Sequence, residues 1–230
     1  MNETEDFYNF ESMYYDKIYG IFNRDVNFYK SLSAFSPCLE LFAGTGRIIS
    51  RFKGGVGLEI NRNMLQRSEN EFIKVMGDAR SLPFKKHFNT VIVGLNSLLL
   101  VPNREKKIIL KEARRVLNKD GFLFVDVING FNLKRSTYDI SEFNDGDLKI
   151  FLKMRAKKIK DHYDLRYSYS IFNRTKRNVE KTITIYPITL VELGEMLDSE
   201  NFEVDGTFGD YDLSPLRTWS EKLIVRAKAI

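Results

Sequence analysis

The sequence predicts an α/β protein: a doubly wound, seven-stranded and mostly parallel sheet into which an antiparallel β meander is inserted. Three features of the 230-residue chain predict this fold class. Short apolar runs alternate with amphipathic stretches between residues 37 and 128, which is typical of βα units. Apolar and charged residues then alternate at period two through residues 147–186. Finally, residues 187–230 return to one helix and two strands.

The composition is that of a globular chain with few metal ligands. Of its residues, 43% are hydrophobic and 13% aromatic, too many for a disordered chain, and 230 residues can build one domain of ordinary to large size. A single cysteine, Cys38, excludes a disulfide framework and a cysteine-based metal site. The two histidines, His87 and His162, are too few for a typical zinc centre, so we expect no metal.

Neither a leader nor a membrane span is visible in the sequence. The acidic N-terminus lacks the basic and apolar regions of a signal peptide. The longest mostly apolar stretch, residues 91–101, is far short of the roughly 20 residues that a membrane span requires. We therefore expect a cytoplasmic protein without a membrane segment.

Residues 1–36 are unusually rich in aromatic side chains. Tyr15, Tyr19 and Phe22 recur at spacings of four and three, which places them on one face of a helix. We expect an N-terminal helical lid over residues 1–36, packed on a core or closing a ligand pocket.

The core is expected to alternate strands and helices. Strands are expected at residues 38–42, 55–59, 72–76, 89–94 and 122–127, and helices at 47–52, 61–69 and 103–117. Asn61 is a good N-cap for the second of these helices. After Pro187, a helix at 190–197 and strands at 202–204 and 223–225 close the chain. The core domain is thus expected to comprise residues 37–143 and 187–230.

Residues 144–186 interrupt this rhythm. Apolar and basic side chains alternate from Lys149 to Lys157, and residues 163–171 and 179–185 alternate in the same way. Three consecutive strands without an intervening helix predict an antiparallel β insert. We expect this insert to cover the substrate or to form a dimer face.

A glycine turn links the first expected strand to the first expected helix. Gly44 and Gly46 let the backbone approach a ligand closely, and a helix start would present free N–H groups there. The Lys-Ser/Thr pair of a P-loop does not follow, and Ile49 stands where a dinucleotide fingerprint needs its third glycine or alanine. No pyrophosphate site is therefore indicated.

Polar side chains end the next three strands in order. Glu59 ends the second, where a carboxylate can accept both hydroxyls of a ribose. Asp78, followed by Ala79, ends the third and could accept from the exocyclic amine of an adenine. Asn96 ends the fourth, at the mouth of the crevice. Because ligands of open α/β sheets bind outside the carboxyl ends of the strands, these positions should converge.

These segments together resemble the class I S-adenosylmethionine-dependent methyltransferases, particularly the small-molecule type with a β insert. The motifs are LELFAGTGR, GLEINRNML, GDARSLPF, FNTVIVGLNSLLLV and ARRVLNKDGFLFVDV. The resemblance covers residues 37–128 and, more loosely, 187–230. It implies a Rossmann-like core with S-adenosyl-L-methionine as the cofactor. In one departure from the family's pattern, Phe42 stands where the first glycine is usual.

The resemblance also implies which residues bind the cofactor. The expected set is Tyr19, Glu40, Ala43, Gly44, Gly46, Glu59, Ile60, Met64, Asp78, Ala79 and Asn96. Glu40 and the glycine turn would line the methionine end, whereas Ile60 and Met64 would flank the adenine. The segment Tyr15-Asp16-Lys17-Ile18-Tyr19 looks like the Tyr-Asp-x-x-Tyr segment that closes over the cofactor in such enzymes.

The expected reaction is in-line transfer of a methyl group to N or O of a small molecule. The sulfonium already activates the methyl group, so the protein must align the acceptor and exclude water. The candidate catalytic residues are Tyr15, Asn96, Asp210 and Tyr211, the last two in a loop that resembles one brought toward the acceptor. If a general base is used, a carboxylate or tyrosine would take the proton.

Two other functions stay open. One is aminopropyl transfer from the decarboxylated cofactor on the same fold. The other is a methyltransferase-like protein whose insert binds RNA or a partner subunit, because residues 147–186 hold 11 Lys and Arg against four Asp and Glu. Methylation of nucleic-acid amino groups is disfavoured, because the Asn/Asp-Pro-Pro-Tyr/Phe signature is absent. The face around Tyr163, Tyr167 and Tyr169 could also form a homodimer.

Overall fold

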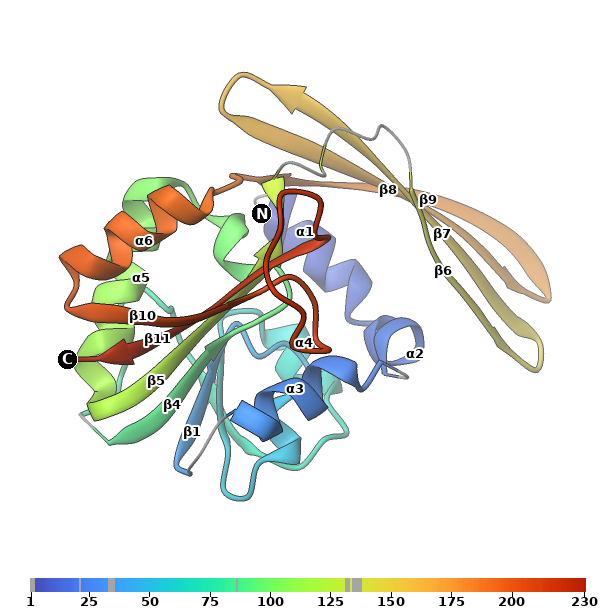
Figure 1. Ribbon diagram of the computed structural model, residues 1–230. Coiled ribbons are helices and arrows are strands. Elements are labelled where there is room, and N and C mark those ends of the chain that lie inside the picture. Colours follow the sequence, from blue (N-terminus) through green and yellow to red (C-terminus); the bar gives the residue numbers. More distant parts are fainter. Residues whose placement is uncertain (1–2, 21, 33–35, 86, 131–132, 134–137) are drawn as a thin grey trace.

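A computed structural model describes residues 3–20, 22–32, 36–85, 87–130, 133 and 138–230. Its main sheet has seven strands in the order β10-β11-β5-β4-β1-β2-β3 (Figure 1). The strands are β1 Cys38–Leu41, β2 Val56–Glu59, β3 Ile73–Met76, β4 Phe88–Val93, β5 Leu117–Ile128, β10 Phe202–Phe208 and β11 Lys222–Ala229. β1 to β5 run parallel, and β11 pairs antiparallel with both β5 and β10. The predicted fold class is confirmed.

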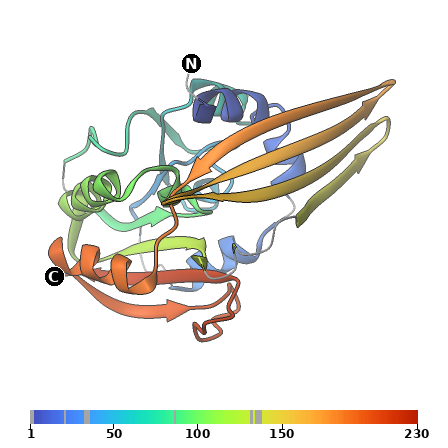
Figure 2. The same ribbon diagram turned by 90° about the horizontal axis from the view of Figure 1, so that it is seen from above.

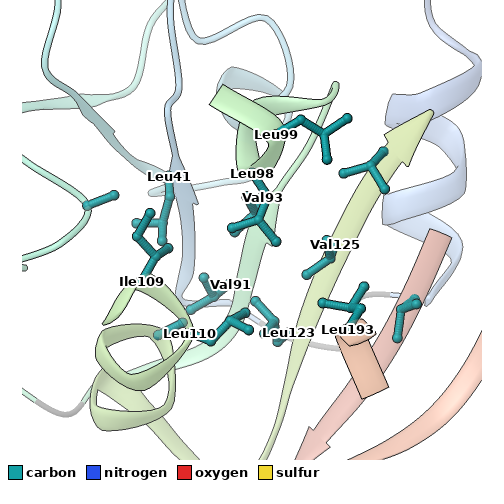
Figure 3. Close-up of a cluster of buried hydrophobic side chains, with 14 of the residues drawn as sticks. Leu41, Val91, Val93, Leu98, Leu99, Ile109, Leu110, Leu123, Val125 and Leu193 are labelled. Atoms are coloured by element: carbon teal, nitrogen blue, oxygen red, sulfur yellow. The ribbon is translucent and has the colours of Figure 1, made fainter. Parts of the chain in front are cut away.

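Alternate residues of the central strands bury opposite faces of this sheet. Val91, Val93 and Val125 pack on the side of α5 (Asn103–Val116) and α6 (Leu190–Ser199), in the cluster drawn in Figure 3. Ile92 and Phe124 pack on the other side, against α3 (Arg24–Leu32). Burying each such side chain stabilises the fold by about 1.5–3 kcal/mol, so a strand with both faces apolar must be covered on both sides.

The expected helix over residues 47–52 is wrong. Only a three-residue 3₁₀ turn, η1 (Ile49–Arg51), forms there. The glycine turn uses the first residues after β1, and the chain must return to β2 through Gly54 and Gly55 soon after Phe52. That leaves too few residues for an α-helix. The expected helix at 61–69 forms as α4 (Arg62–Arg67), with Asn61 as its N-cap.

The insert has four strands rather than the three expected. β6 (Tyr138–Asp145), β7 (Leu148–Ile159), β8 (His162–Asn173) and β9 (Thr175–Ile185) form one antiparallel sheet. Figure 2 shows it extending from the core as a long arm. The sequence of β6, YDISEFND, lacks the apolar alternation that indicates a strand, so its formation depends on pairing with β7.

The N-terminal segment packs between the core and the insert. It contains α1 (Glu3–Glu11) and α2 (Tyr15–Tyr19) ahead of α3. Phe10 and Ile18 contribute to a buried cluster with Ile150 and Tyr169 of the insert. The Glu11 carboxylate is buried there and accepts hydrogen bonds from the Tyr19 and Tyr169 hydroxyls at 3.2 and 2.9 Å. Within the described part of the chain, no helix is long and apolar enough to cross a membrane.

Candidate functional site

A cavity of about 730 Å³ opens at the carboxyl ends of β1, β2, β3 and β4. Its walls also include residues of α1, α2 and α4. Nine of the residues predicted from the sequence line it: Tyr15, Glu40, Ala43, Gly44, Glu59, Ile60, Met64, Asp78 and Ala79. Four separate segments of the sequence therefore converge on one cavity, as expected for the ligand site of an open α/β sheet.

The glycine turn at the floor of this cavity has a left-handed backbone at three positions. Phe42, Gly44 and Gly46 have φ angles of 58°, 57° and 75°. Glycine adopts such angles without cost, whereas a side chain there costs about 1–2 kcal/mol. The family's usual first glycine therefore meets a real backbone requirement, and Phe42 meets it with strain.

Gly46 has a packing role within the turn. A Cβ atom at this position would lie 2.0 Å from the ring of Phe72. Its N–H donates to the carbonyl of Ala43 at 2.7 Å. Because no α-helix follows, the turn does not present the helix N-terminus that the sequence suggested. Gly46 is not among the lining residues of the cavity.

Glu59 is held rigidly at the end of β2. Its Oε2 accepts from the N–H of Gly44 at 2.8 Å and its Oε1 from the N–H of Asn61 at 2.7 Å. Burial raises the pKa of this carboxyl, and the backbone hydrogen bonds oppose that rise. Since each carboxylate oxygen can accept more than one hydrogen bond, Glu59 can still accept from ligand hydroxyls.

The β2–β3 end of the cavity comprises Glu59, Ile60, Met76 and Asp78. Ile60 and Met76 line the cavity although they are 59% and 64% exposed, so both offer apolar surface to a ligand there. Arg80 donates to both oxygens of Asp78 at 2.6–3.0 Å and holds the pKa of that carboxyl below its usual range. Sequence reasoning missed Met76, whose signal is its position as the last residue of an edge strand.

The glycine-turn end of the cavity comprises Glu40 and Arg47. The Glu40 carboxylate is buried and accepts from the N–H of Ile49 at 3.0 Å, and burial raises its pKa to about 8. Arg47 is 7% exposed and its guanidinium pairs with both oxygens of Asp25 on α3. Arg47 also donates to the carbonyl of Phe22. Arg47 and Asp25 are not among the residues predicted from the sequence, although Arg47 follows the glycine turn directly.

Of the two tyrosines expected to close over the cofactor, only Tyr15 lines the cavity. Burial raises its pKa, so its hydroxyl is neutral at physiological pH. Tyr19 contacts Tyr15 with ring centroids 4.8 Å apart, but its hydroxyl donates to Glu11 at the insert. Tyr19 therefore does not line the cavity itself but packs against Tyr15, which does.

The other candidate catalytic residues belong to a polar cluster at the end of β5. Its centre is the fully buried Asp126, whose Oδ2 accepts from the hydroxyls of Tyr29 at 3.1 Å and Tyr211 at 2.5 Å. Asn96 donates its N–H to the Asp126 carbonyl, and its Oδ1 accepts from the N–H of Ile128. Asp210 pairs with Arg24 of α3 at 2.9 Å.

This cluster lies directly behind the cavity wall. A Cβ atom on Gly94, which lines the cavity, would be 3.2 Å from the Tyr29 hydroxyl. Leu95, another lining residue, donates its N–H to Asp126 at 3.3 Å. Asn96, Asp210 and Tyr211 are therefore brought together, but none is among the lining residues. No pattern in the sequence indicates that Asp126 and Tyr29 would meet.

Comparisons with known proteins agree with this geometry. Residues 39–125 match the family model described as a methyltransferase domain. The chain is 27% identical over 204 residues to uncharacterized protein MJ1252 of Methanocaldococcus jannaschii, covering 87% of this chain and 74% of that protein.

Two solved structures share the fold over most of the chain. An S-adenosylmethionine-dependent methyltransferase from Clostridium acetobutylicum superposes with a TM-score of 0.80 at 15% identity, covering 96% of this chain and 98% of that one. CalS10 of Micromonospora echinaspora, an amino pentose methyltransferase with bound S-adenosylmethionine, gives 0.71 at 13% identity and covers 89% and 87%. At these identities the likeness establishes the fold.

Proposed function

We propose that this chain methylates N or O of a small molecule with S-adenosyl-L-methionine. Its residues 39–125 match the model of a methyltransferase domain, and its fold is that of the class I S-adenosylmethionine-dependent methyltransferases. The observation that supports the proposal is the convergence of Glu59, Asp78 and the glycine turn on one cavity. The amino pentose methyltransferase with the same fold also favours a small acceptor, such as an amine on a sugar.

The chemistry of the lining residues fits this cofactor. Glu59 offers carboxylate oxygens for the ribose hydroxyls, and Ile60 and Met76 offer apolar contacts for the two faces of adenine. Asp78 offers a carboxylate oxygen as an acceptor for the exocyclic amine of the adenine. Ligand pockets of drug-sized molecules measure about 300–1,000 Å³, so a cavity of about 730 Å³ has room for the cofactor and part of an acceptor.

The bound cofactor supplies a methyl group activated by its positively charged sulfur. The chain's own contribution is to hold the acceptor in line and to keep water out. Tyr8 and Tyr15, on α1 and α2, close the cavity on the side of the lid. The acceptor proton would pass to water or to a carboxylate that lines the cavity, such as Glu5 or Glu105.

The four candidate catalytic residues divide into two roles in this proposal. Tyr15 lines the cavity and, as a neutral hydroxyl, orients the acceptor by hydrogen bonding. Asn96, Asp210 and Tyr211 act as positioning residues, because their polar atoms are engaged at the end of β5 or with α3. Asn96 and Tyr211 contact Asp126, which in turn accepts from the N–H of Leu95 in the cavity wall, and Asp210 accepts from the N–H of Tyr211.

Calorimetric titration of the protein with S-adenosylhomocysteine tests the cofactor site. Glu59→Gln and Asp78→Asn should each weaken binding by roughly 10- to 100-fold, because each removes charge-assisted hydrogen bonds worth about 1.5–3 kcal/mol. The matched control is Glu203→Gln, an exposed carboxylate on β10, which should leave the affinity unchanged. Wild-type affinity in both site variants, or no binding by the wild type, would contradict the proposal.

A further inference from the structure

Arg47 has one buried donor with no protein partner. Its two terminal nitrogens are used by Asp25 and the Phe22 carbonyl, but no hydrogen-bond acceptor reaches its Nε among the described residues. Among the described residues, Nε of Arg226 is also buried without a hydrogen-bond partner, but Arg226 does not line the cavity. Leaving a buried donor unpaired lowers the stability of the fold by about 1–3 kcal/mol, so a ligand that placed an acceptor beside Arg47 Nε would remove this cost.

Several backbone N–H groups near Arg47 are already engaged. Those of Gly44, Gly46 and Ile49 donate to Glu59, the Ala43 carbonyl and Glu40. The turn is followed by a 3₁₀ segment of three residues, so no α-helix contributes its N-terminal charge there. Arg47 therefore supplies a full positive charge at the glycine-turn end of the cavity.

One buried cation and one buried carboxyl group line this end. Arg47 is a fixed cation and Glu40 a carboxyl group, and both side chains are buried. A ligand carrying a carboxylate and an ammonium on neighbouring atoms would suit both, because its carboxylate would face the guanidinium and its ammonium would favour the ionised form of Glu40. The amino-acid end of S-adenosylmethionine is such a group.

We propose that Arg47 Nε donates to the α-carboxylate of the cofactor and that Asp25 positions the guanidinium for this contact. The inference rests on the proposed function and adds to it the residue that selects the carboxylated cofactor. The paired contact with Asp25 fixes the planar guanidinium, so that Nε has one direction in which to donate. The decarboxylated cofactor would leave Nε unpaired, which favours methyl transfer over aminopropyl transfer.

A titration of matched ligands against matched variants tests this assignment. S-adenosylhomocysteine and 5′-methylthioadenosine share the adenosine and the sulfur, but the second lacks the amino-acid end. In Arg47→Gln/Asp25→Asn, which removes both charges and leaves neither unpaired, affinity for S-adenosylhomocysteine should fall roughly 10- to 100-fold. Affinity for 5′-methylthioadenosine should stay within about twofold, since its contacts are elsewhere. Arg51→Gln, an exposed arginine of the same turn, is the control and should change neither affinity.

Three outcomes would overturn the assignment. An equal loss of affinity for both ligands in the double variant would mean that the pair acts through folding alone. Unchanged affinity for S-adenosylhomocysteine would mean that Nε does not bind the carboxylate. Wild-type protein that binds neither ligand would overturn the proposed function and this assignment with it. If the double variant fails to fold by thermal melting, the wild type decides: equal affinities for S-adenosylhomocysteine and its decarboxylated analogue would overturn the assignment, and a preference of tenfold or more for the former would support it.

Discussion

The two ends of the cavity are built by different kinds of contact. At the β2–β3 end, Glu59 is held by the N–H of Asn61 two residues away and by that of Gly44 fifteen residues away. At the glycine-turn end, Arg47 depends on Asp25 of another element, 22 residues away. The wall behind it depends on Tyr211, which reaches Asp126 across 85 residues. In the proposed function, recognition of the nucleoside thus needs a short stretch of chain, whereas the glycine-turn end needs the docking of α3 and the β10–β11 connection.

The largest expected effect follows from the buried pair at the glycine-turn end. Asp25→Ala leaves the positive charge of the Arg47 guanidinium buried without its partner carboxylate. Removing one member of a buried ion pair lowers the free energy of unfolding by about 3–5 kcal/mol. Urea unfolding measured by circular dichroism checks this value.

An exposed pair on the same helix is the control. Asp210→Ala breaks the ion pair with Arg24, whose side chain is 66% exposed, and should change the free energy of unfolding by about 0–1 kcal/mol. Equal losses of unfolding free energy in Asp25→Ala and Asp210→Ala would contradict this prediction, because they would mean that the buried ion pair stabilises the fold no more than the exposed one.

A smaller effect is expected within the glycine turn. In Gly46→Ala the new methyl group meets the Phe72 ring in a backbone conformation that disfavours side chains, so the free energy of unfolding should fall by about 2–4 kcal/mol. Gly54→Ala has a similar φ but no atom within 4 Å of its Cβ, and should lose about 1–2 kcal/mol. A Gly54→Ala loss as large as that of Gly46→Ala would mean that backbone strain, and not Phe72, fixes Gly46.

The smallest effect is a proton released on binding. Burial raises the pKa of Glu40 to about 8, helped by the nearby Asp25 and Glu59 carboxylates and opposed by the Ile49 N–H and the Arg47 guanidinium, so at pH 7 most of this carboxyl is protonated. A ligand ammonium favours the ionised form and lowers the pKa, so binding at pH 7 should release up to about one proton. The release should vanish at pH 9, where Glu40 is already ionised. Calorimetry of S-adenosylhomocysteine binding in buffers of different ionisation enthalpy measures it.

A second buried carboxyl group, outside the cavity, shows whether the released proton comes from Glu40 in particular. Burial raises the pKa of Glu11 to about 7, but Glu11 faces Tyr19 and Tyr169 at the insert and does not line the cavity. Glu11→Gln should therefore keep the proton release, whereas Glu40→Gln should abolish it. Release that disappears in Glu11→Gln alone would contradict the position assigned to the ligand ammonium.

The same contrast explains what the sequence could predict. The succession of strands along the chain and the lining roles of Glu59 and Asp78 follow from local patterns, because a strand end and the turn after it lie within a few residues. The helix expected at 47–52 fails because the return to β2 left no room for it, which depends on the position of β2 in the sheet. β6 forms only by pairing with β7, so its own residues gave no signal.

The contacts at the glycine-turn end depend on tertiary structure alone. No spacing in the sequence relates Asp25 to Arg47, or Tyr29 and Tyr211 to Asp126, because each partner comes from a separate element. For the same reason the sequence predicts Asn96 and Tyr211 as catalytic residues, whereas the Asn96 Oδ1 and the Tyr211 hydroxyl are engaged at the end of β5. Their catalytic roles stay predictions.

A crystal structure of the protein with S-adenosylhomocysteine tests both ends of the cavity at once. We expect the ribose hydroxyls within hydrogen-bond distance of Glu59, the adenine between Ile60 and Met76, and the ligand carboxylate on Arg47 Nε. A nucleoside bound elsewhere on the molecule, or a ligand whose carboxylate leaves Arg47 untouched while Glu59 faces no hydroxyl, would contradict this expectation.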